Sequence, residues 1–319
     1  MKNLRRIMVV IDPTVERDFV TDRVRNIIDA DRRERALTGG SGDGGSEHPA
    51  IELRFFINSA NTLNQQSHAY EGMGAAFIEK QRQLYVEHYN KILTALLEEF
   101  TAADVIASSA FTEEPDLSDA IIHQVREYQP GLVLKSTHQH SVLQRTLITN
   151  TDWRLIRKCP APLLLVKHRD WIEHGSVVAS VDPLHAKAEQ SRLDHALIRS
   201  AEQIAERFHQ TARVFHCYFP FVSTMFPSAL ETREQTESIQ RQHEEKMQEL
   251  LASHHIDPSH VEMSRGELVP ALINFLEKCS ANVLVIGALS RNFLERAIVG
   301  STAEKILDDC PCDILVIKP

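Results

Sequence analysis

A glycine- and hydroxyl-rich segment near the end of the chain has the residue types that bind phosphate. Its residues are Gly287, Ser290, Gly300, Ser301 and Thr302. Glycine lets backbone N–H groups approach an anion, and a helix dipole favours negative charge at the first turn. In an open parallel sheet, ligands bind beyond the carboxyl ends of the strands. The segment therefore predicts a phosphate-binding loop after a strand near residues 282–286.

The same helix start has a second explanation that needs no ligand. Ser301-Thr302-Ala303-Glu304 matches a capping box, in which the Ser301 and Glu304 side chains satisfy backbone amides of the first turn. On spacing alone, the cap and the phosphate site are equally favoured.

Other residues that could do chemistry lack the partners that the chemistry needs. His138 and His140 could form a metal pair, but no carboxylate or cysteine stands at a supporting spacing. Cys310-Pro311-Cys312 is better explained by packing of small buried side chains at a helix-to-strand turn. No G-x-S-x-G motif is present, and no nucleophile, base and acid follow strands together. The sequence thus offers no catalytic machinery.

A polar helix is predicted over residues 231–253, where Glu and Gln dominate and Met247, Leu250 and Leu251 form an apolar stripe. His254 and His255 follow it as terminal cations or polar caps. We expect no further role for these two histidines.

The sequence repeats itself. Cys159-Pro160 and the apolar run after it recur at Cys310-Pro311, 151 residues later, and the same offset relates the runs 132–134 and 283–285. Each half also begins with an apolar run that ends in Asp-Pro, at Asp12 and Asp182. A unit this long indicates two copies of one domain, because solenoid repeats have periods of roughly 20–50 residues.

Within each half, short apolar runs alternate with longer helical patterns, which is typical of βαβ units around a parallel sheet. Strands are predicted near 5–11, 51–58, 103–108, 131–136 and 162–167, and again near 176–181, 212–218, 260–264, 282–286 and 312–317. In the second half, helices are predicted near 187–208, 231–253, 267–279 and 301–309. The glycine-rich stretch 39–45 indicates a loop insertion in the first half.

Length and composition set limits on the class of protein. A chain of 319 residues is expected to form two domains, since one domain takes about 100–200 residues. The net charge of -9 and the lack of a basic run argue against nucleic-acid binding. No apolar run approaches the roughly 20 residues of a membrane span, and no signal peptide is recognised. Together with five cysteines, an odd number, these features favour reduced thiols and a cytoplasmic location.

The glycine-rich segment resembles the nucleotide-binding signature G-x2-G-x9-G-[ST] of the universal stress protein family, and the resemblance covers the whole chain. It implies an α/β fold of two tandem five-stranded parallel-sheet domains, Rossmann-like and similar to adenine nucleotide alpha hydrolases. The expected domains are residues 1–170 and 171–319. By the same resemblance, they pair through their last strands, as family dimers do.

In nucleotide-binding members of the family, an aspartate after the first strand and backbone at the end of the second strand hold adenine and ribose. The glycine motif holds ribose and phosphates. In this chain the matching residues are Asp182, Cys217, Gly287, Ser290, Gly300, Ser301 and Thr302. Two positions depart from the family pattern: Ser290 replaces a glycine, and Pro183 replaces a small residue.

The first half does not retain the motif. The repeat offset places Ser136, Gln139, Thr149 and Asn150 at the positions of the signature, so no glycine is left there. We therefore expect at most one nucleotide per chain. Asn150 and Asp152 suit a helix start, and Asp12 is expected to be structural.

The resemblance implies a cytoplasmic stress-response protein whose second domain binds ATP or another adenine nucleotide, with or without Mg²⁺, as a sensor or switch. Resistance to stress, including DNA damage, is the implied role. Slow ATP hydrolysis ranks lower, because no general base is identifiable. The alternative is a scaffold or carrier that binds a protein or an apolar, lipid-like ligand. Neither nucleic acid nor membrane is an expected partner, and a homodimer stays open.

Overall fold

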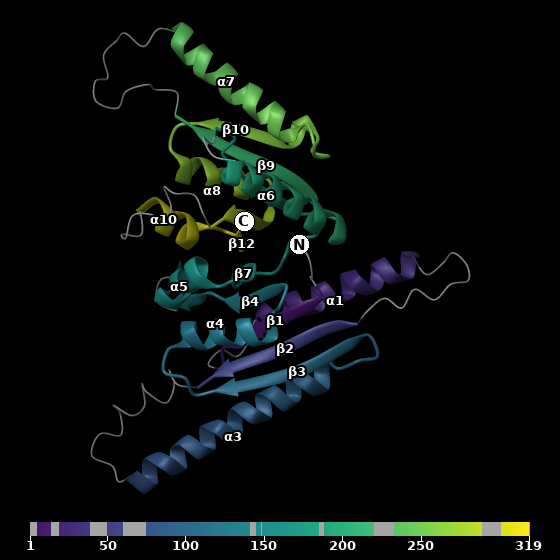
Figure 1. The fold of residues 1–319 in the computed structure, drawn as a ribbon, viewed down its shortest axis with the longest axis vertical. Helices are drawn as coiled ribbons and strands as arrows, with labels where there is room; N and C mark the ends of the chain where they lie inside the picture. The colour runs from purple at the N-terminus through teal and green to yellow at the C-terminus, as the bar shows by residue number, and fades with distance from the viewer. Residues whose placement is uncertain are drawn as a thin grey trace. The chain divides into compact units, whose positions relative to one another are not determined.

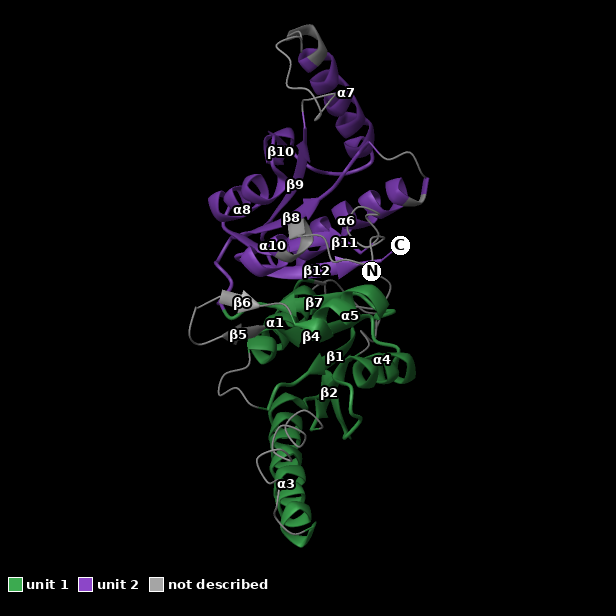
Figure 2. Cartoon of the chain, turned by 90° about the vertical axis from the view of Figure 1, so that its left-hand side faces the viewer, with its two compact units in different colours: residues 1–139, 148–168 green, residues 140–147, 169–319 purple. Residues whose placement is uncertain are grey.

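We describe a computed structural model of the chain. It describes residues 5–13, 19–38, 50–59, 75–140, 145–147, 149–184, 188–219, 233–288 and 301–318. The chain divides into two compact units (Figure 2). Unit 1 comprises residues 1–139 and 148–168, and unit 2 comprises residues 140–147 and 169–319.

Unit 1 is built on five parallel strands in the order β3-β2-β1-β4-β7 (Figure 1). The strands are β1 (Arg6–Val10), β2 (Ile51–Asn58), β3 (Val105–Thr112), β4 (Leu132–Ser136) and β7 (Leu163–Val166). The helices are α1 (Phe19–Thr38), α3 (Ala75–Phe100), α4 (Leu117–Tyr128) and α5 (Asn150–Lys158). Two short strands, β5 (His138–His140) and β6 (Arg145–Leu147), lie between β4 and α5 in the chain.

Unit 2 repeats this arrangement with the order β10-β9-β8-β11-β12, again all parallel. Its strands are β8 (Ser176–Ser180), β9 (Thr211–Tyr218), β10 (Val261–Arg265), β11 (Ala281–Gly287) and β12 (Asp313–Ile317). Its helices are α6 (Ala188–Arg207), α7 (Arg233–Leu251), α8 (Leu268–Lys278) and α10 (Ser301–Asp309), with a 3-10 turn η1 (Pro258–His260). The predicted fold class, two tandem five-stranded parallel α/β domains, is confirmed.

Side chains of β9 alternate between the two faces of the unit 2 sheet, as the period of a strand requires. Phe215 packs against Phe275 of α8, with ring centroids 5.4 Å apart. The next residue, His216, contacts His243 of α7 instead. Helices α8 and α7 therefore cover opposite faces.

Strand β3 is longer than the prediction near 103–108 allowed. It extends to Thr112, because its residues pair with the full length of β2, from Ile51 with Val105 to Asn58 with Thr112. Long-range pairing thus carries the strand through Ser108, Ser109 and Ala110, whose own strand propensity is modest. The predicted loop insertion at 39–45 lies outside the described residues.

The segment after β7 is fastened to unit 2 by side-chain hydrogen bonds. Arg169 donates to the Pro311 carbonyl, and Trp171 Nε1 donates to Asp313 Oδ2 at 2.8 Å. The amide of Asn282 bonds the backbone of Ile172 twice, at 2.8 and 2.7 Å. His168, the preceding residue, donates from Nε2 to the Thr137 carbonyl of unit 1 at 2.7 Å.

No helix in the described part of the chain combines the length and the hydropathy that a membrane span requires.

Candidate functional site

Three of the seven predicted site residues lie side by side at the carboxyl edge of the unit 2 sheet. Ser180 of β8 pairs with Phe215 of β9, so Asp182 and Cys217 follow at the same level two residues later. On the other side of β8, Ala179 pairs with Val285, which brings Gly287 level with Val181. Neighbouring strands lie about 4.8 Å apart, so these residues converge.

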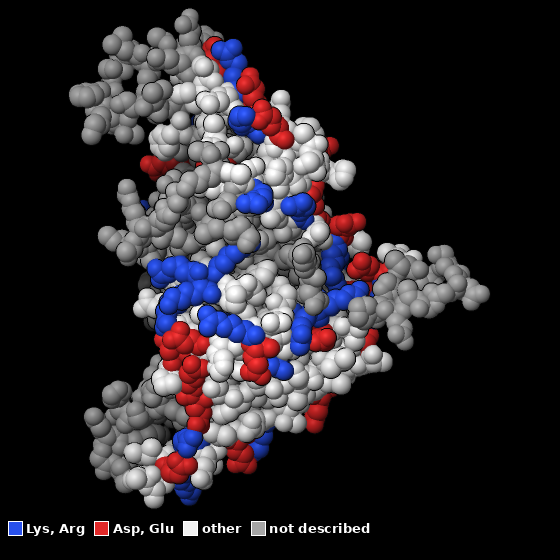
Figure 3. Space-filling model, viewed as in Figure 1, with Lys and Arg blue, Asp and Glu red and all other residues white. Residues whose placement is uncertain are grey.

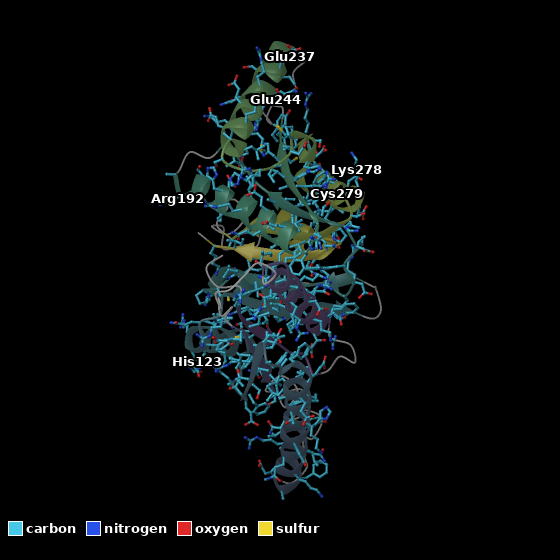
Figure 4. The ribbon with its side chains drawn as sticks, turned by 90° about the vertical axis from the view of Figure 1, so that its right-hand side faces the viewer. His123, Arg192, Glu237, Glu244, Lys278 and Cys279 are labelled. Carbon is cyan, nitrogen blue, oxygen red and sulfur yellow. The ribbon has the colours of Figure 1, made fainter. Side chains whose placement is uncertain are left out.

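After β8 the chain adds β9 on one side of β8 and later adds β11 on its other side. The strand order therefore reverses at β8. Such a reversal of strand order is where open α/β sheets bind ligands. Figure 4 shows the two ends of the unit: Arg192, near the start of α6, marks the carboxyl side. Lys278, the last residue of α8, and Cys279 after it mark the opposite side.

Asp182 is the residue at this edge most accessible to a ligand. Its side chain is exposed, and Oδ1 accepts a long hydrogen bond of 3.4 Å from the backbone N–H of Leu184. That bond holds the turn after β8, and Pro183 lies within it. The backbone N–H of Asp182 donates to Asp194 Oδ1 of α6, also at 3.4 Å.

Cys217 is half-buried, and its Sγ contacts the Gly266 carbonyl at 3.4 Å. Burial raises the pKa of the thiol, so the thiolate is disfavoured and the residue is no nucleophile. A ligand at this position would meet the backbone at the end of β9.

Gly287 packs closely against a neighbouring side chain, with no ligand involved. A Cβ at this position would stand 2.5 Å from Cδ2 of Leu193 and 3.1 Å from its Cγ. A side chain at 287 would therefore require the Leu193 side chain of α6 to move. Sequence reasoning assigned this glycine to a phosphate; the structure gives it an additional, internal reason.

The remaining predicted residues belong to the segment between β11 and α10. Ser290 and Gly300 lie outside the described residues. Ser301 and Thr302 open α10, and only their backbone is described. The choice between a capping box and a phosphate site at this helix start thus stays open.

A cluster of titratable side chains beside Asp182 was not predicted. It consists of Asp194 on α6, His216 on β9 and His243 on α7. Burial raises the pKa of Asp194 to about 7, and the nearby Asp182 carboxylate adds to the rise. His216 Nδ1 lies 3.1 Å from the Val181 carbonyl, and His216 Nε2 lies 2.8 Å from His243 Nδ1. The sequence feature that could have indicated this cluster is His216, a histidine within the apolar run of β9.

The prediction that His254 and His255 are only terminal caps is wrong. His254 is buried, with Nδ1 3.1 Å from Glu202 Oε2 and Nε2 2.9 Å from His195 Nδ1. The rings of His195 and His254 stack with centroids 5.1 Å apart. The backbone N–H of His255 donates to Glu202 Oε1 at 2.6 Å.

In unit 1, an ion pair flanks the positions equivalent to the glycine motif. Lys135 Nζ, at the end of β4, lies 2.8 Å from Asp152 Oδ1 in the first turn of α5, and both side chains are buried. Asp152 Oδ2 accepts from the backbone N–H and the hydroxyl of Thr149, which caps the helix and in turn accepts from the Asp152 N–H. The predicted helix start is confirmed, with Thr149 as the capping residue and Asn150 as the first helical one.

The cysteines behave as packed thiols, as predicted. Cys159, Cys310 and Cys312 are buried, and Cys310 Sγ lies 3.6 Å from Cys312 Sγ. Burial raises the pKa of Cys312 well above its usual value. Among the described residues, no three His, Cys, Asp or Glu side chains are arranged to hold a metal ion.

Basic side chains gather over α5 in the face shown in Figure 3, with acidic side chains beside them. The last turn of α5 carries Arg157 and Lys158. Arg154 is neutralised by Asp119, at 2.8 Å, and by Asp116. The fold thus assembles a basic cluster that no sequence run announced, and acidic residues of α4 compensate part of it.

Comparison with known proteins covers both units. The model of the universal stress protein family matches residues 62–167 and 188–318. Universal stress protein E of Salmonella typhi is 32% identical over 209 residues, which cover 63% of this chain and 65% of that relative. Universal stress protein E of Photorhabdus laumondii is 26% identical and aligns over 100% of this chain and 96% of its own length. A solved protein of Pseudomonas aeruginosa UCBPP-PA14 shares the fold, with a TM-score of 0.69 and 23% identity over 99% of this chain and 94% of that one.

Proposed function

Because the chain belongs to the universal stress protein family, we propose that its second unit binds an adenine nucleotide and acts as a sensor or switch in the stress response. The site is the carboxyl edge of β8, β9 and β11, where Asp182, Cys217 and Gly287 converge. Asp182 would bind ribose or adenine, and Ser290, Gly300, Ser301 and Thr302 would surround the phosphates.

The observation that carries this proposal is the alignment of Asp182 with the ends of β9 and β11 at the reversal of strand order. The start of α10 at Ser301 adds a helix dipole that favours phosphate. Mg²⁺ would accompany ATP at the phosphates. The protein would act in the cytoplasm and support resistance to stress, including DNA damage, through its nucleotide state rather than through turnover.

One observation favours a second candidate function, a scaffold or carrier that uses no nucleotide. Gly287 is explained by its contact with Leu193, so this member of the glycine motif does not require a phosphate. In that case a protein or an apolar, lipid-like molecule would be the ligand. Native mass spectrometry of freshly purified protein separates the two functions, since a nucleotide or a lipid would be detected by its mass.

Calorimetric titration with ATP tests the nucleotide site directly. We expect at most one site per chain, and Gly300→Val should abolish binding while the circular dichroism spectrum stays nearly unchanged. The matched control is Thr149→Val, which places the same side chain at the equivalent position of unit 1 and should leave the affinity for ATP unchanged. Two equivalent sites, or unchanged affinity in Gly300→Val, would contradict the proposal.

We also propose that residues 1–170 and 171–319 are domains that associate through the strands 162–167 and 312–317. Within its own unit, β7 is last in the strand order, and so is β12. An open edge strand tends to pair with another chain. Halves expressed separately, with the cut between His168 and Arg169 so that Arg169 keeps its bond to Pro311, should therefore form homodimers or a one-to-one complex on sizing. Stable monomers that do not interact would contradict this pairing.

A further inference from the structure

Helix α7 contacts the rest of unit 2 through a face that is only partly apolar. The buried side chains of its described portion are Met247 and Leu250, and Gln240 and His243 lie on the same face at helical spacing. Gln240 bonds Arg265 of β10, and His243 bonds His216 of β9. Two buried apolar side chains, with Ile239 and Leu251 half-buried beside them, hold the helix together with these polar contacts.

The contact between His216 and His243 has a defined pattern of proton donors. A carbonyl only accepts, so the N–H of His216 Nδ1 must donate to Val181 O, 3.1 Å away. When His216 is neutral, its Nε2 accepts, and His243 Nδ1 donates to it over 2.8 Å. One extra proton can reside on His243 Nε2 without breaking either bond. A second would place two N–H groups against each other, and the bond between the rings would be lost.

A second histidine pair, His195 and His254, repeats this pattern just beyond the end of α7. Glu202 of α6 accepts from His254 Nδ1 at 3.1 Å, and in the neutral pair His254 Nε2 accepts from His195 Nδ1 at 2.9 Å. Here too one added proton is tolerated and two are not. Both histidine pairs therefore fasten α7 and the segment after it, one to β9 and the other to α6.

We propose that the pairs His216–His243 and His195–His254 form a proton-sensitive latch, which holds α7 on unit 2 at neutral pH and releases it in acid. The released helix would bind one more proton at each pair than the docked helix does. The latch does not require a nucleotide, because none of the four bonds involves a ligand. The solvent exposure of residues 236–255 should therefore increase as the pH falls.

The groups that face each pair set the direction of the response. Burial and His216 lower the pKa of His243, and Asp182 offsets part of this. Burial lowers the pKa of His195, and His254 and Arg199 lower it further. Tyr218 stacks on His243, and Glu202 accepts a hydrogen bond from His254 Nδ1. A histidine whose folded pKa is depressed stabilises the docked state above about pH 6.5 and loses this contribution as the pH falls.

Asp194 acts in the opposite direction. Its raised pKa of about 7 means that the folded state binds a proton that the unfolded state releases down to about pH 4. Acid therefore stabilises the turn between β8 and α6 while it releases α7. A global melting curve would mix the two effects, so the measurement has to be local.

Hydrogen exchange followed by mass spectrometry on the full chain tests the latch. After correction for intrinsic exchange, protection of residues 236–251 should fall by at least about tenfold from pH 7.5 to 5.0, and at most about a hundredfold per pH unit, while β11 stays protected. In the double variant His195→Gln/His243→Gln the fall should shrink below about twofold, because glutamine bonds its partner in either protonation state. His123→Gln, on the surface of unit 1 (Figure 4), is the matched control and should respond like wild type.

Equal protection at both pH values in the wild type would overturn the proposal, and so would an undiminished fall in the double variant. If the double variant is already unprotected at pH 7.5, imidazole nitrogen NMR of the wild type decides. At pH 7.5, His216 must carry its proton on Nδ1. An Nε2–H tautomer at His216 would contradict the donor order on which the latch depends.

Discussion

The two halves of this chain differ in the charges at the start of the helix that follows the fourth strand. In each half, a buried strand is followed along the chain by a short helix: α5 follows β4 in unit 1, and α10 follows β11 in unit 2. Lys135 and Asp152 form a buried ion pair at the first junction. The repeat offset places Ile286 and Ala303 at the equivalent positions of the second.

The two helices differ in which group places negative charge at the N-terminal end of the helix dipole. Asp152 brings a carboxylate to the first turn of α5, accepts from two groups of Thr149 and is balanced by Lys135. Unit 2 has neither charge at those positions, so its helix start is left to a capping box or to an external anion. The carboxylate and the cation at this junction of unit 1 thus both come from the chain itself.

The largest expected effect comes from breaking the ion pair. Lys135→Ile or Asp152→Ala, each copied from unit 2, should destabilise unit 1 by about 3–5 kcal/mol, because the surviving charge is left buried. The double variant should recover most of this loss. Urea unfolding in a Trp171→Phe background isolates the signal of Trp153, since the chain has two tryptophans. Additive losses in the double variant would mean that the two charges do not stabilise each other.

The reverse exchange should remove the site in unit 2. Ala303→Asp would place a carboxylate where a phosphate is proposed to bind, and like-charge repulsion should weaken ATP binding by about 2–3 kcal/mol, or roughly a hundredfold. Calorimetric titration measures the loss, with Ala303→Ser as the uncharged control. Binding that survives the aspartate would place the phosphates elsewhere.

A smaller effect is expected at the end of β11. Gly287→Ala should destabilise unit 2 by about 1–3 kcal/mol, because the new Cβ would overlap Leu193. Trp171 fluorescence in a Trp153→Phe background reports this unit. Leu193→Ala in the same chain should relieve the overlap and make the alanine at 287 less costly. An unchanged midpoint for Gly287→Ala would show that α6 yields at this contact.

The smallest change restores the family pattern. Ser290→Gly should tighten ATP binding by about 1 kcal/mol if the Cβ limits approach of the phosphates, which is the scale of one modest hydrogen bond or strained contact. Competition between wild type and variant for a fluorescent ATP analogue measures this difference. Weaker binding would identify the Ser290 hydroxyl as a ligand.

Much of the fold was predictable because apolar runs and the repeat are local signals. The strands of both halves and the start of α5 follow from such patterns, and the position of Asp182 follows from the rule that sites lie at carboxyl edges. The two histidine pairs were not predictable. His216 and His243 are 27 residues apart, and His195 and His254 are 59 apart. Only the packing of α7 brings each pair together.

The ion pair of unit 1 shows the same limit. Lys135 and Asp152 stand in the sequence as a strand residue and a helix-start residue, each with an ordinary local explanation. That they neutralise each other depends on the junction between β4 and α5. Likewise, Gly287 was assigned from a motif, while its contact with Leu193 depends on how closely α6 approaches β11.

The change from one unit to the other falls between two neighbouring residues of the chain, His168 and Arg169. His168 is bonded to Thr137, and its ring lies 5.5 Å from that of Phe19, while Arg169 is bonded to Pro311. Adjacent residues thus belong to different units, and the exposed residues that follow, Asp170 and 172–174, belong to unit 2. A cut after residue 170 would leave Arg169 on the wrong fragment. Fragments meant to fold alone should therefore end at His168 and begin at Arg169.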